Sequence, residues 1–536
     1  MSALRGLSAF VLWAAPILAM LPAATLLMQY YQLSSYQAGG YLRALRRQAR
    51  KVFWPGVALF AASVIFLYVG SLALPLHPLV SLPISLLCAA AVLLCGYAAG
   101  FLSYREKKAK TRLVFTPRIR RLYAALLAVG LLAGAALGAL VPRAGMTSVL
   151  PLLLPFWVLL AAWLAWPLEK AIQLLYRLDA RRILDRYREG GLTVIGITGS
   201  YGKTSVKNAL GAMLSQKGPA CVTPASFNTP MGLARCIRED LGPQHRFFVA
   251  EMGARHPQDI RVLGRFIRPQ AGILTAIGPQ HLETMGTIEQ IGKTKYDLIR
   301  ALPHDGFAVF SHDGALVSEY HEKTAVPKAL VGIPGSAAWA EDVELGRDGS
   351  RFTLCLPDGG RAFVQTRLAG EHSVRNILMA AVMAMRFGVT LEQVRRAAEG
   401  LYPLPSRLQA SRHAGGWTAI NNGFNSNPDS SRKALEVLRG YPGRRIVVTP
   451  GFIEQGRQEE EANRRLGSDI AAVADLALLV GEKRTRPILQ GLLEGGMPEE
   501  NVRMFASLAD ANAFVAQNCG EGDTVLYEND LPDHYS

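Results

Sequence analysis

Long uninterrupted apolar runs separate the first third of the chain from the rest. These runs fall near residues 7–29, 53–75, 78–102, 122–142 and 147–167. Each is long enough to cross the roughly 30 Å hydrocarbon layer of a bilayer as a helix. The first run also resembles a signal peptide with Ala23-Ala24 as its cleavage region, but the four runs that follow favour an uncleaved span. The pattern therefore predicts a membrane domain with five transmembrane helices over residues 1–167.

Residues 168–190 continue from the last run as a basic amphipathic segment. Leucine and isoleucine recur at helical spacing from Leu168 to Leu184, which predicts a helix that connects the membrane domain to the next domain. Two interpretations stay open for this connector: a helix that lies along the membrane face, or an ordinary linker helix.

From residue 191 onward, short apolar runs alternate with helical patterns, which is typical of a mostly parallel α/β sheet. We predict a central domain of the phosphate-loop type over residues 191–403. A smaller Rossmann-like α/β domain is predicted over residues 404–536, with Pro403 and Pro405 at the boundary. Segment 305–370 carries only short β-like runs and is interpreted as part of the central domain. Within the smaller domain the pattern predicts strands at 444–449, 476–480 and 523–527 and a helix at 459–473.

The positive charge of the chain is confined to its first third. Residues 1–190 hold 21 Lys and Arg against 5 Asp and Glu, a balance of +16 that equals the formal net charge of the whole chain. This placement favours a membrane surface as the partner and argues against nucleic acid. The 6 cysteines are scattered without a CxxC pair, which favours a reduced compartment.

Basic residues also predict how the spans are oriented. They are concentrated in the first and third loops, from Arg43 to Lys51 and from Arg105 to Arg121, whereas the second loop has none and the fourth has only Arg143. The positive-inside rule then places the N-terminus outside and everything after residue 167 in the cytoplasm. The predicted location is the cell membrane, with several passes and with cytoplasmic α/β domains.

The clearest chemical signal is the stretch TGSYGKTS. It follows the apolar strand Val194–Ile197 and opens a helix at Lys203, so that free backbone N–H groups and the positive helix end face an anion. Lys203 can reach terminal phosphates, and the Thr204 hydroxyl can ligate magnesium. The strict pattern GxxxxGK[ST] fails because Ile197 holds the first glycine position. We assign to nucleotide binding Gly199, Ser200, Tyr201, Gly202, Lys203, Thr204 and Ser205.

Two further polar residues follow predicted strands. Glu251 ends the strand that begins at Phe247, and His281 comes just after the strand predicted at 271–277. Ligands bind at the carboxyl ends of strands in open α/β sheets. We therefore expect Glu251 and His281 to lie beside the phosphates as magnesium ligands.

The helix predicted at Thr287–Leu302 carries a lysine on its apolar face. That face is formed by Ile288, Ile291, Leu298, Ile299 and Leu302. Lys295 falls in the middle of it, whereas Lys293 falls on the polar side. A buried lysine must be paired, neutral or modified. A neutral amine can take up carbon dioxide and become an anionic metal ligand; a lysine that extends from the edge of the core is the alternative.

Seven motifs occur in an order and spacing that resembles the Mur ligase family. They are TGSYGKTS, SFNTPMG, AEMGARH, PQHLETMGTIEQIGKTK, GEHSVRN, SRLQ and NSNPDSSRKAL. Within the family they are most similar to the ligases that add D-alanyl-D-alanine to the UDP-muramoyl tripeptide. The resemblance covers roughly residues 191–536. It implies an ATP-dependent, magnesium-requiring ligation in which ATP phosphorylates a carboxylate and an amine attacks the acyl phosphate.

The resemblance also implies roles for individual residues. Lys203, His281 and Lys295 are expected to be catalytic. Thr204, Glu251, His281 and a carbamylated Lys295 are expected to bind the metal ions. Asn376 matches the asparagine of the adenine pocket, and Arg407 matches the arginine that reaches the nucleotide from the domain junction. Asn228 and Asn425 match positions near the substrate.

The chain departs from the family pattern on the amine side of the reaction. Asn421-Asn422 stand where the family's peptide ligase has a pair of aspartates. Residues 527–530 (YEND) replace a KGS-like run with its lysine, and residues 449–453 (TPGFI) replace a GDM-type segment. The resemblance does not extend to the family's N-terminal UDP-sugar domain, because five apolar runs occupy that part of the chain.

Three functions are compatible with these observations. The first is a membrane-tethered ligase for a cell-envelope, peptidoglycan-related amide. It would join an amino acid or dipeptide to a carboxylate acceptor, for which a lipid-linked form is one option. The second is a poly-γ-glutamate-type synthase. The third is a non-catalytic nucleotide-binding scaffold for envelope assembly, which the replaced aspartates suggest.

Overall fold

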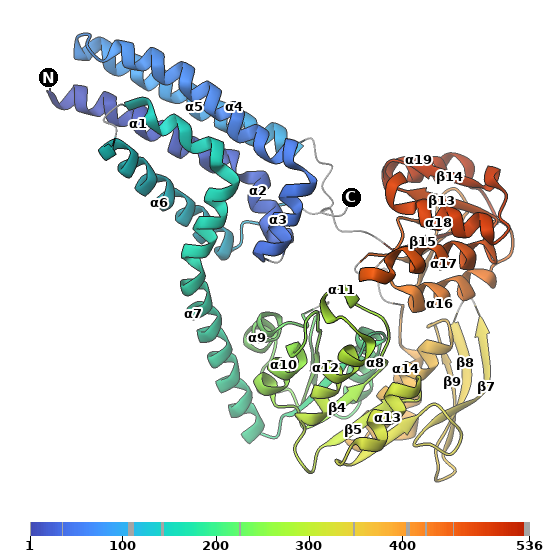
Figure 1. The fold of residues 1–536 in the computed structure, drawn as a ribbon. Helices are drawn as coiled ribbons and strands as arrows, with labels where there is room; N and C mark the ends of the chain where they lie inside the picture. Colours follow the sequence, from blue (N-terminus) through green and yellow to red (C-terminus); the bar gives the residue numbers. More distant parts are fainter. Residues whose placement is uncertain are drawn as a thin grey trace. The chain divides into compact units, whose positions relative to one another are not determined.

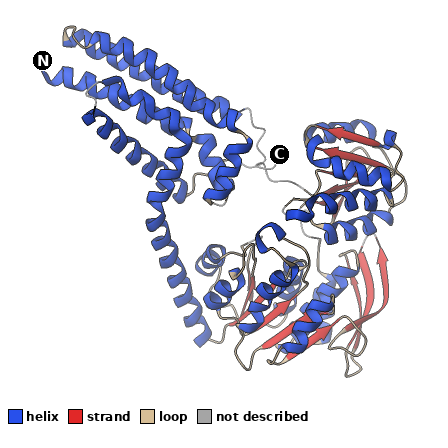
Figure 2. Cartoon of the chain, in the orientation of Figure 1, coloured by secondary structure: helices blue, strands red, loops and turns tan. Residues whose placement is uncertain are grey.

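The computed structural model describes residues 2–34, 36–105, 112–140, 144–224, 227–346, 349–403, 408–423, 426–453 and 455–529. They form two compact units, and the division between the units falls inside one long helix, between Gln173 and Leu174. Figure 1 colours the chain from the N-terminal helices to the C-terminal α/β domain, and Figure 2 separates helices from strands.

The first unit is helical. Its elements are α1 Ser2–Ala23, α2 Thr25–Leu33, α3 Ala38–Arg47, α4 Ala49–Ala73, α5 Pro78–Arg105, α6 Pro117–Leu140, the 3-10 helix η1 Ala144–Leu153 and the beginning of α7 Leu154–Glu189. Five helical segments, at Ser2–Ala23, Ala49–Ala73, Pro78–Tyr104, Pro117–Leu140 and Met146–Glu189, are long and apolar enough to cross a membrane. Helices α1 and α5 approach closely at Gly100, where an added Cβ would lie 2.1 Å from the Pro22 carbonyl oxygen. Small residues of this kind allow apolar helices to pack backbone to backbone.

Two of the predicted runs are not single α-helices. The first run is divided at Ala24, between α1 and α2. The fifth begins as the 3-10 helix η1, which contains Pro151. Proline lacks the backbone donor that an α-helix needs in its interior, and this effect is not visible in a count of apolar residues.

The fifth span from Leu154 onward and the predicted connector form one continuous helix, α7. From Ala180 onward its apolar residues belong to the core of the α/β domain, where Ala180 and Leu184 are fully buried. Arg188 near the end of α7 donates a hydrogen bond to the Arg268 carbonyl oxygen at 2.7 Å. The last part of the connector therefore packs against protein rather than along a membrane face.

The central domain is built on a six-stranded parallel sheet with the order β2-β3-β1-β4-β5-β6. Its strands are β1 Thr193–Thr198, β2 Ala220–Val222, β3 Phe247–Glu251, β4 Ala271–Leu274, β5 Phe307–Ser311 and β6 Lys328–Val331. Its helices are α8 Lys203–Leu214, α9 Pro230–Glu239, α10 Asp259–Ile267, α11 Leu282–Met285, α12 Ile288–Arg300, α13 Ala315–Lys323, α14 Glu371–Arg386 and α15 Leu391–Glu399. Because β1 lies between β3 and β4, the residues that follow β1 are at the centre of the carboxyl edge of the sheet.

Alternate residues of β1 enter different hydrophobic cores. Ile195 and Ile197 pack with α8, α14 and α15 on one face, whereas Val194 packs with α9, α10 and α12 on the other. This follows from the two-residue period of a strand. Both faces of the sheet are covered, as expected for a parallel sheet.

Segment 305–370 is more regular than the sequence indicates. It contains β5, α13 and β6, followed by a separate antiparallel sheet of β7 Trp339–Gly346, β8 Gly349–Cys355 and β9 Arg361–Thr366. Phe352 and Val364 of this small sheet join the core beneath α14. Residues of α14 and α15 share this core, so each strand of the sheet needs only a short hydrophobic pattern.

The C-terminal domain has a six-stranded mixed sheet with the order β10-β11-β15-β12-β13-β14. Its elements are β10 Gln409–Arg412, β11 Thr418–Asn422, α16 Pro428–Arg439, β12 Arg445–Thr449, η2 Gly456–Gln458, α17 Glu459–Ala471, β13 Leu476–Val480, α18 Glu482–Glu494, η3 Glu499–Asn501, β14 Val502–Phe505, α19 Leu508–Asn518 and β15 Thr524–Glu528. Within this sheet, β10–β11 is the antiparallel pair and the other pairs between described strands are parallel. The predicted fold class, apolar helices followed by a parallel-sheet domain and a smaller α/β domain, is confirmed.

Candidate active site

The glycine turn after β1 requires glycine at two positions, 199 and 202. Gly199 has a φ of +154°, and a Cβ there would lie 1.9 Å from the Thr275 hydroxyl oxygen. Gly202 has a φ of +79°, and a Cβ there would lie 2.6 Å from the Asn376 side-chain oxygen. Because glycine tolerates both the positive φ and the close approach, the chain can turn tightly into α8, and the first N–H groups of a helix are suited to bind an anion.

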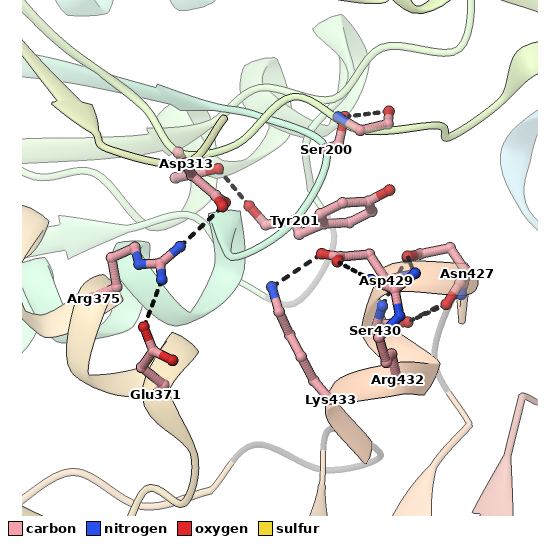
Figure 3. Close-up of polar contacts among 12 residues, drawn as sticks. Ser200, Tyr201, Asp313, Glu371, Arg375, Asn427, Asp429, Ser430, Arg432 and Lys433 are labelled. Carbon is pink, nitrogen blue, oxygen red and sulfur yellow. Dashed lines mark hydrogen bonds and ion pairs between the residues drawn. The ribbon is translucent and has the colours of Figure 1, made fainter. Parts of the chain in front are cut away.

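The segment after β4 holds this turn in place. The Ser200 N–H donates to the Ala276 carbonyl oxygen at 2.7 Å, and the Ser200 hydroxyl donates to the Gly278 carbonyl oxygen at 3.0 Å (Figure 3). Thr275 also donates to the Tyr201 carbonyl oxygen. Strand β4 ends at Leu274 rather than at the predicted Ile277, because the next residues bond to the turn instead of to a neighbouring strand.

Lys203 folds back over the turn. Its Nζ donates to the carbonyl oxygens of Gly199 at 2.7 Å and of Ser200 at 3.1 Å. The ammonium group therefore lies at the mouth of the turn, next to the helix end that favours an anion. This is the position from which a lysine can contact the terminal phosphates of a nucleotide.

Glu251, the last residue of β3, joins the turn to a second buried lysine. Its carboxylate accepts hydrogen bonds from the Thr204 hydroxyl at 2.8 Å and from the Asn228 amide at 3.2 Å. Lys207 Nζ lies 3.4 Å from the same carboxylate and is 1% exposed. Burial alone would raise the pKa of Glu251, but the charges of Lys203 and Lys207 and these hydrogen bonds outweigh burial and lower it. Glu251 is therefore ionised at neutral pH.

The Thr204–Glu251 pair fits magnesium. A hydroxyl and a carboxylate oxygen 2.8 Å apart are hard ligands, and Mg²⁺ is usually held by one or two carboxylates together with phosphate oxygens and water. Among the described residues there is no cluster of three or more His, Cys, Asp or Glu side chains. The chain therefore offers a partial coordination shell that a bound nucleotide would complete.

Lys295 reaches the same turn from the opposite side. It lies on α12, is 2% exposed, and its Nζ donates to the Gly199 carbonyl oxygen at 2.9 Å. Burial, together with the charge of Lys203, lowers the pKa of Lys295 well below its ordinary value. Lys293 is exposed, as the helical periodicity predicts. The geometry favours a neutral amine at Lys295.

Two of the other predicted site residues, Asn376 and Asn228, also lie at this site. Asn376 is buried on α14 beside Gly202, and Asn228 is bonded to Glu251. Ser205 lies in the first turn of α8. His281 precedes α11 with a φ of +56°, on the segment that follows the turn-holding residues. Arg407 and Asn425 lie outside the described residues.

Several polar residues around the turn were not predicted. Arg375 bridges Asp313 at 2.9 Å and Glu371 at 2.8 Å, and Lys433 of α16 pairs with Asp429 at 3.0 Å. Figure 3 shows both groups on either side of Tyr201, and Lys433 Nζ lies 6.0 Å from the centre of the Tyr201 ring. Glu371 and Arg375 lie inside the motif GEHSVRN, and Asp429 and Lys433 lie inside NSNPDSSRKAL, which is the signal by which they could have been found; Asp313 belongs to neither motif.

Next to these groups, His372 is held neutral. Burial lowers the pKa of its imidazole to about 4, and the cations Lys433 and Arg375 add to the effect. Charged groups from both α/β domains therefore influence the surroundings of the glycine turn.

The similarity to known proteins covers the central and C-terminal α/β domains. Models of the Mur ligase middle domain and of the Mur ligase, glutamate ligase domain match residues 197–384 and 406–527. The UDP-N-acetylmuramoyl-tripeptide–D-alanyl-D-alanine ligase of Mycobacterium tuberculosis (strain CDC 1551 / Oshkosh) is 33% identical over 354 residues, which are 63% of this chain and 67% of that protein.

Solved structures agree with this likeness. MurF from Acinetobacter baumannii has a TM-score of 0.60 at 27% identity, with coverage of 66% of this chain and 77% of the other. The MurF ligase of Thermotoga maritima in complex with ADP has the same fold, with a TM-score of 0.59 at 23% identity and coverage of 67% and 80%.

Proposed function

The chain belongs to the Mur ligase family of ATP-dependent peptide ligases, and we propose that it is a membrane-tethered member that acts through an acyl phosphate on a lipid-held acceptor. The observation that supports catalysis most strongly is the Lys203–Thr204–Glu251 arrangement around the glycine turn. A carboxylate bonded to the phosphate-loop threonine at 2.8 Å is suited to the magnesium ion that phosphoryl transfer uses.

Different residues of the site contribute to different parts of the proposed reaction. A substrate carboxylate oxygen bonds to the γ-phosphorus of ATP and ADP leaves; the amine then bonds to the acyl carbon, loses a proton, and phosphate leaves. Lys203 and the N–H groups at the start of α8 stabilise charge on the transferring phosphoryl group. Thr204 and Glu251 would hold magnesium, which neutralises phosphate charge when bound. Asn228 orients the Glu251 carboxylate.

The acceptor is proposed to be held at the membrane. The five long apolar helical segments between Ser2 and Glu189 lie before the first matched family domain, which begins at residue 197. The same chain therefore joins ligase domains to a part that suits a bilayer. An acceptor that is anchored in the lipid would be concentrated beside the active site without a UDP-sugar domain.

Turnover of two acceptors tests this proposal. With ATP and D-alanyl-D-alanine or another amine, the full-length protein in lipid nanodiscs is expected to form product with a lipid-linked muramoyl peptide. Little product is expected with the soluble UDP-muramoyl tripeptide. ADP release and mass spectrometry of the product measure both. Comparable turnover of the soluble acceptor would contradict the lipid-held acceptor, and product with neither acceptor would contradict the ligase.

The proposed orientation places the N-terminus outside and the α/β domains in the cytoplasm, because the basic loops are expected on the inner side. Single cysteines in a variant without the 6 native cysteines test it. The Arg112→Cys variant is expected to be protected from an impermeant maleimide in intact cells, and the His77→Cys variant is expected to be labelled. The opposite labelling pattern would overturn the orientation.

A further inference from the structure

Lys207 is a buried cation beside the glycine turn that the reaction described above does not use. It lies on α8 and is 1% exposed. Its Nζ donates to the Thr223 carbonyl oxygen at 2.7 Å and lies 3.4 Å from Oε2 of Glu251. The Thr223 hydroxyl in turn accepts a hydrogen bond from the Glu251 N–H at 3.1 Å. Lys207 therefore links the residue that follows β2 to the carboxylate that ends β3.

Lys207 and Thr204 contact the same carboxylate oxygen. The two residues are three positions apart on α8, a spacing that places side chains on one face of a helix. The Thr204 hydroxyl donates to Oε2 of Glu251 at 2.8 Å, and this is the oxygen that faces Lys207 Nζ. The other oxygen, Oε1, accepts from the Asn228 amide at 3.2 Å. The ammonium group of Lys207 thus lies against the carboxylate that is expected to hold magnesium.

The charges around Glu251 disfavour a further cation while no nucleotide is bound. The largest charge effects on its carboxylate come from Lys203 and Lys207, and both are positive. One carboxylate therefore faces two ammonium groups, and a divalent cation placed beside it would meet net repulsion. The phosphates of ATP would reverse this balance, because they bring several negative charges to the same turn.

The stability of the fold does not by itself explain a lysine at this position. Replacing a buried ion pair by apolar residues of similar volume is often neutral or stabilising. The α8 residues Val206 and Leu210, which flank Lys207 in the chain, are apolar and fully buried. An ammonium group that is buried in this setting and directed at a metal ligand indicates a role in the nucleotide site.

We propose that Lys207 is a positioning residue that serves as the counter-ion of Glu251 in the nucleotide-free protein. It holds the carboxylate beside Thr204 and keeps free divalent cations away from it, so that magnesium enters this site together with the phosphates of ATP and not before them. The proposal rests on the ATP-dependent ligase proposed above and adds the order in which metal and nucleotide reach the chain. Lys207 acts through Glu251 and needs no contact with the nucleotide.

Mn²⁺ binding to the nucleotide-free protein tests the proposal. Mn²⁺ takes the same oxygen ligands as Mg²⁺, and electron paramagnetic resonance measures its free concentration. The full-length protein is titrated in nanodiscs of a zwitterionic lipid, in buffer free of carbon dioxide so that Lys295 stays unmodified. Without nucleotide, wild type and Glu251→Gln are expected to bind Mn²⁺ equally weakly. With a non-hydrolysable ATP analogue, wild type should bind Mn²⁺ more tightly than Glu251→Gln does.

The variant Lys207→Met removes the ammonium group and keeps an unbranched side chain. We expect its nucleotide-free affinity for Mn²⁺ to rise about tenfold or more, because a cation close to the carboxylate is removed. Adding Glu251→Gln to this variant should abolish the gain. Lys217→Met is the matched control, since it removes an exposed lysine that follows the same helix, and it should bind Mn²⁺ as wild type does. Loss of structure would not produce a gain that depends on Glu251.

Tight, Glu251-dependent Mn²⁺ binding by the nucleotide-free wild type would overturn the inference without any change at Lys207. The inference would also fail if Lys207→Met, shown to be folded by its thermal unfolding, bound Mn²⁺ no more tightly than wild type. Binding of the ATP analogue is measured in the same samples. A wild type that does not bind the analogue counts against the proposed ligase, whereas either of the two results above with intact analogue binding counts against this inference alone.

Discussion

Replacing Lys203 by alanine is expected to slow ATP-dependent ligation by about 10²-fold or more, because it removes a cation that stabilises charge on the transferring phosphoryl group. In the structure this ammonium lies over the turn, 2.7 Å from the Gly199 carbonyl oxygen, and no backbone group can supply its charge. The rate of ADP release in the presence of both substrates, measured in detergent or nanodiscs, checks the expectation.

Lys217→Ala is the matched control for this variant. Lys217 is an exposed lysine that follows the same helix, α8, so its loss changes the net charge equally without touching the turn. It should retain wild-type activity. A Lys203→Ala protein that is folded and as active as wild type would remove the basis for placing phosphoryl transfer at this turn.

The features that could be predicted from the sequence are those whose residues are neighbours in the chain. The glycine turn was predicted because a strand, two glycines and Lys203-Thr204 are adjacent in the chain. Its structure then shows why Gly199 and Gly202 are required, through contacts with Thr275 and Asn376. Strands β12, β13 and β15 were predicted within one residue of either end, because each is a short apolar run with clear boundaries.

Interactions between distant segments could not be predicted in the same way. Asn422 and Glu528 are 106 residues apart, and each was visible in the sequence only as a separate departure. No sequence pattern indicated the role of Lys207. It lies beside the apolar face of helix α8, and its partner Glu251 is at the end of strand β3. The small sheet β7–β9 was interpreted as irregular because its strands carry only short apolar runs, and the rest of its hydrophobic core comes from α14 and α15.

Replacing Lys295 by alanine is expected to abolish ligation, because we propose that this lysine carries a carbamate that serves as a metal ligand near His281. Carbamate formation requires a neutral amine, and both burial and the charge of Lys203 lower the pKa of Lys295. The modification would change the charge at this position from positive to negative. A second cation would then be favoured beside the acyl phosphate oxygens.

Lys293→Ala separates the carbamate from a general effect of losing a lysine on α12. Lys293 is two residues away and exposed, so its removal should leave the rate nearly unchanged. In Lys295→Ala, a short carboxylate such as acetate, or bicarbonate, is expected to restore part of the activity, since either anion can occupy the vacant ligand position. Ligation rates with and without the anion measure this. Mass spectrometry under carbon dioxide tests the modification directly. Equal rates for the two variants would show that the buried position of Lys295 serves packing and its hydrogen bond to Gly199 rather than catalysis.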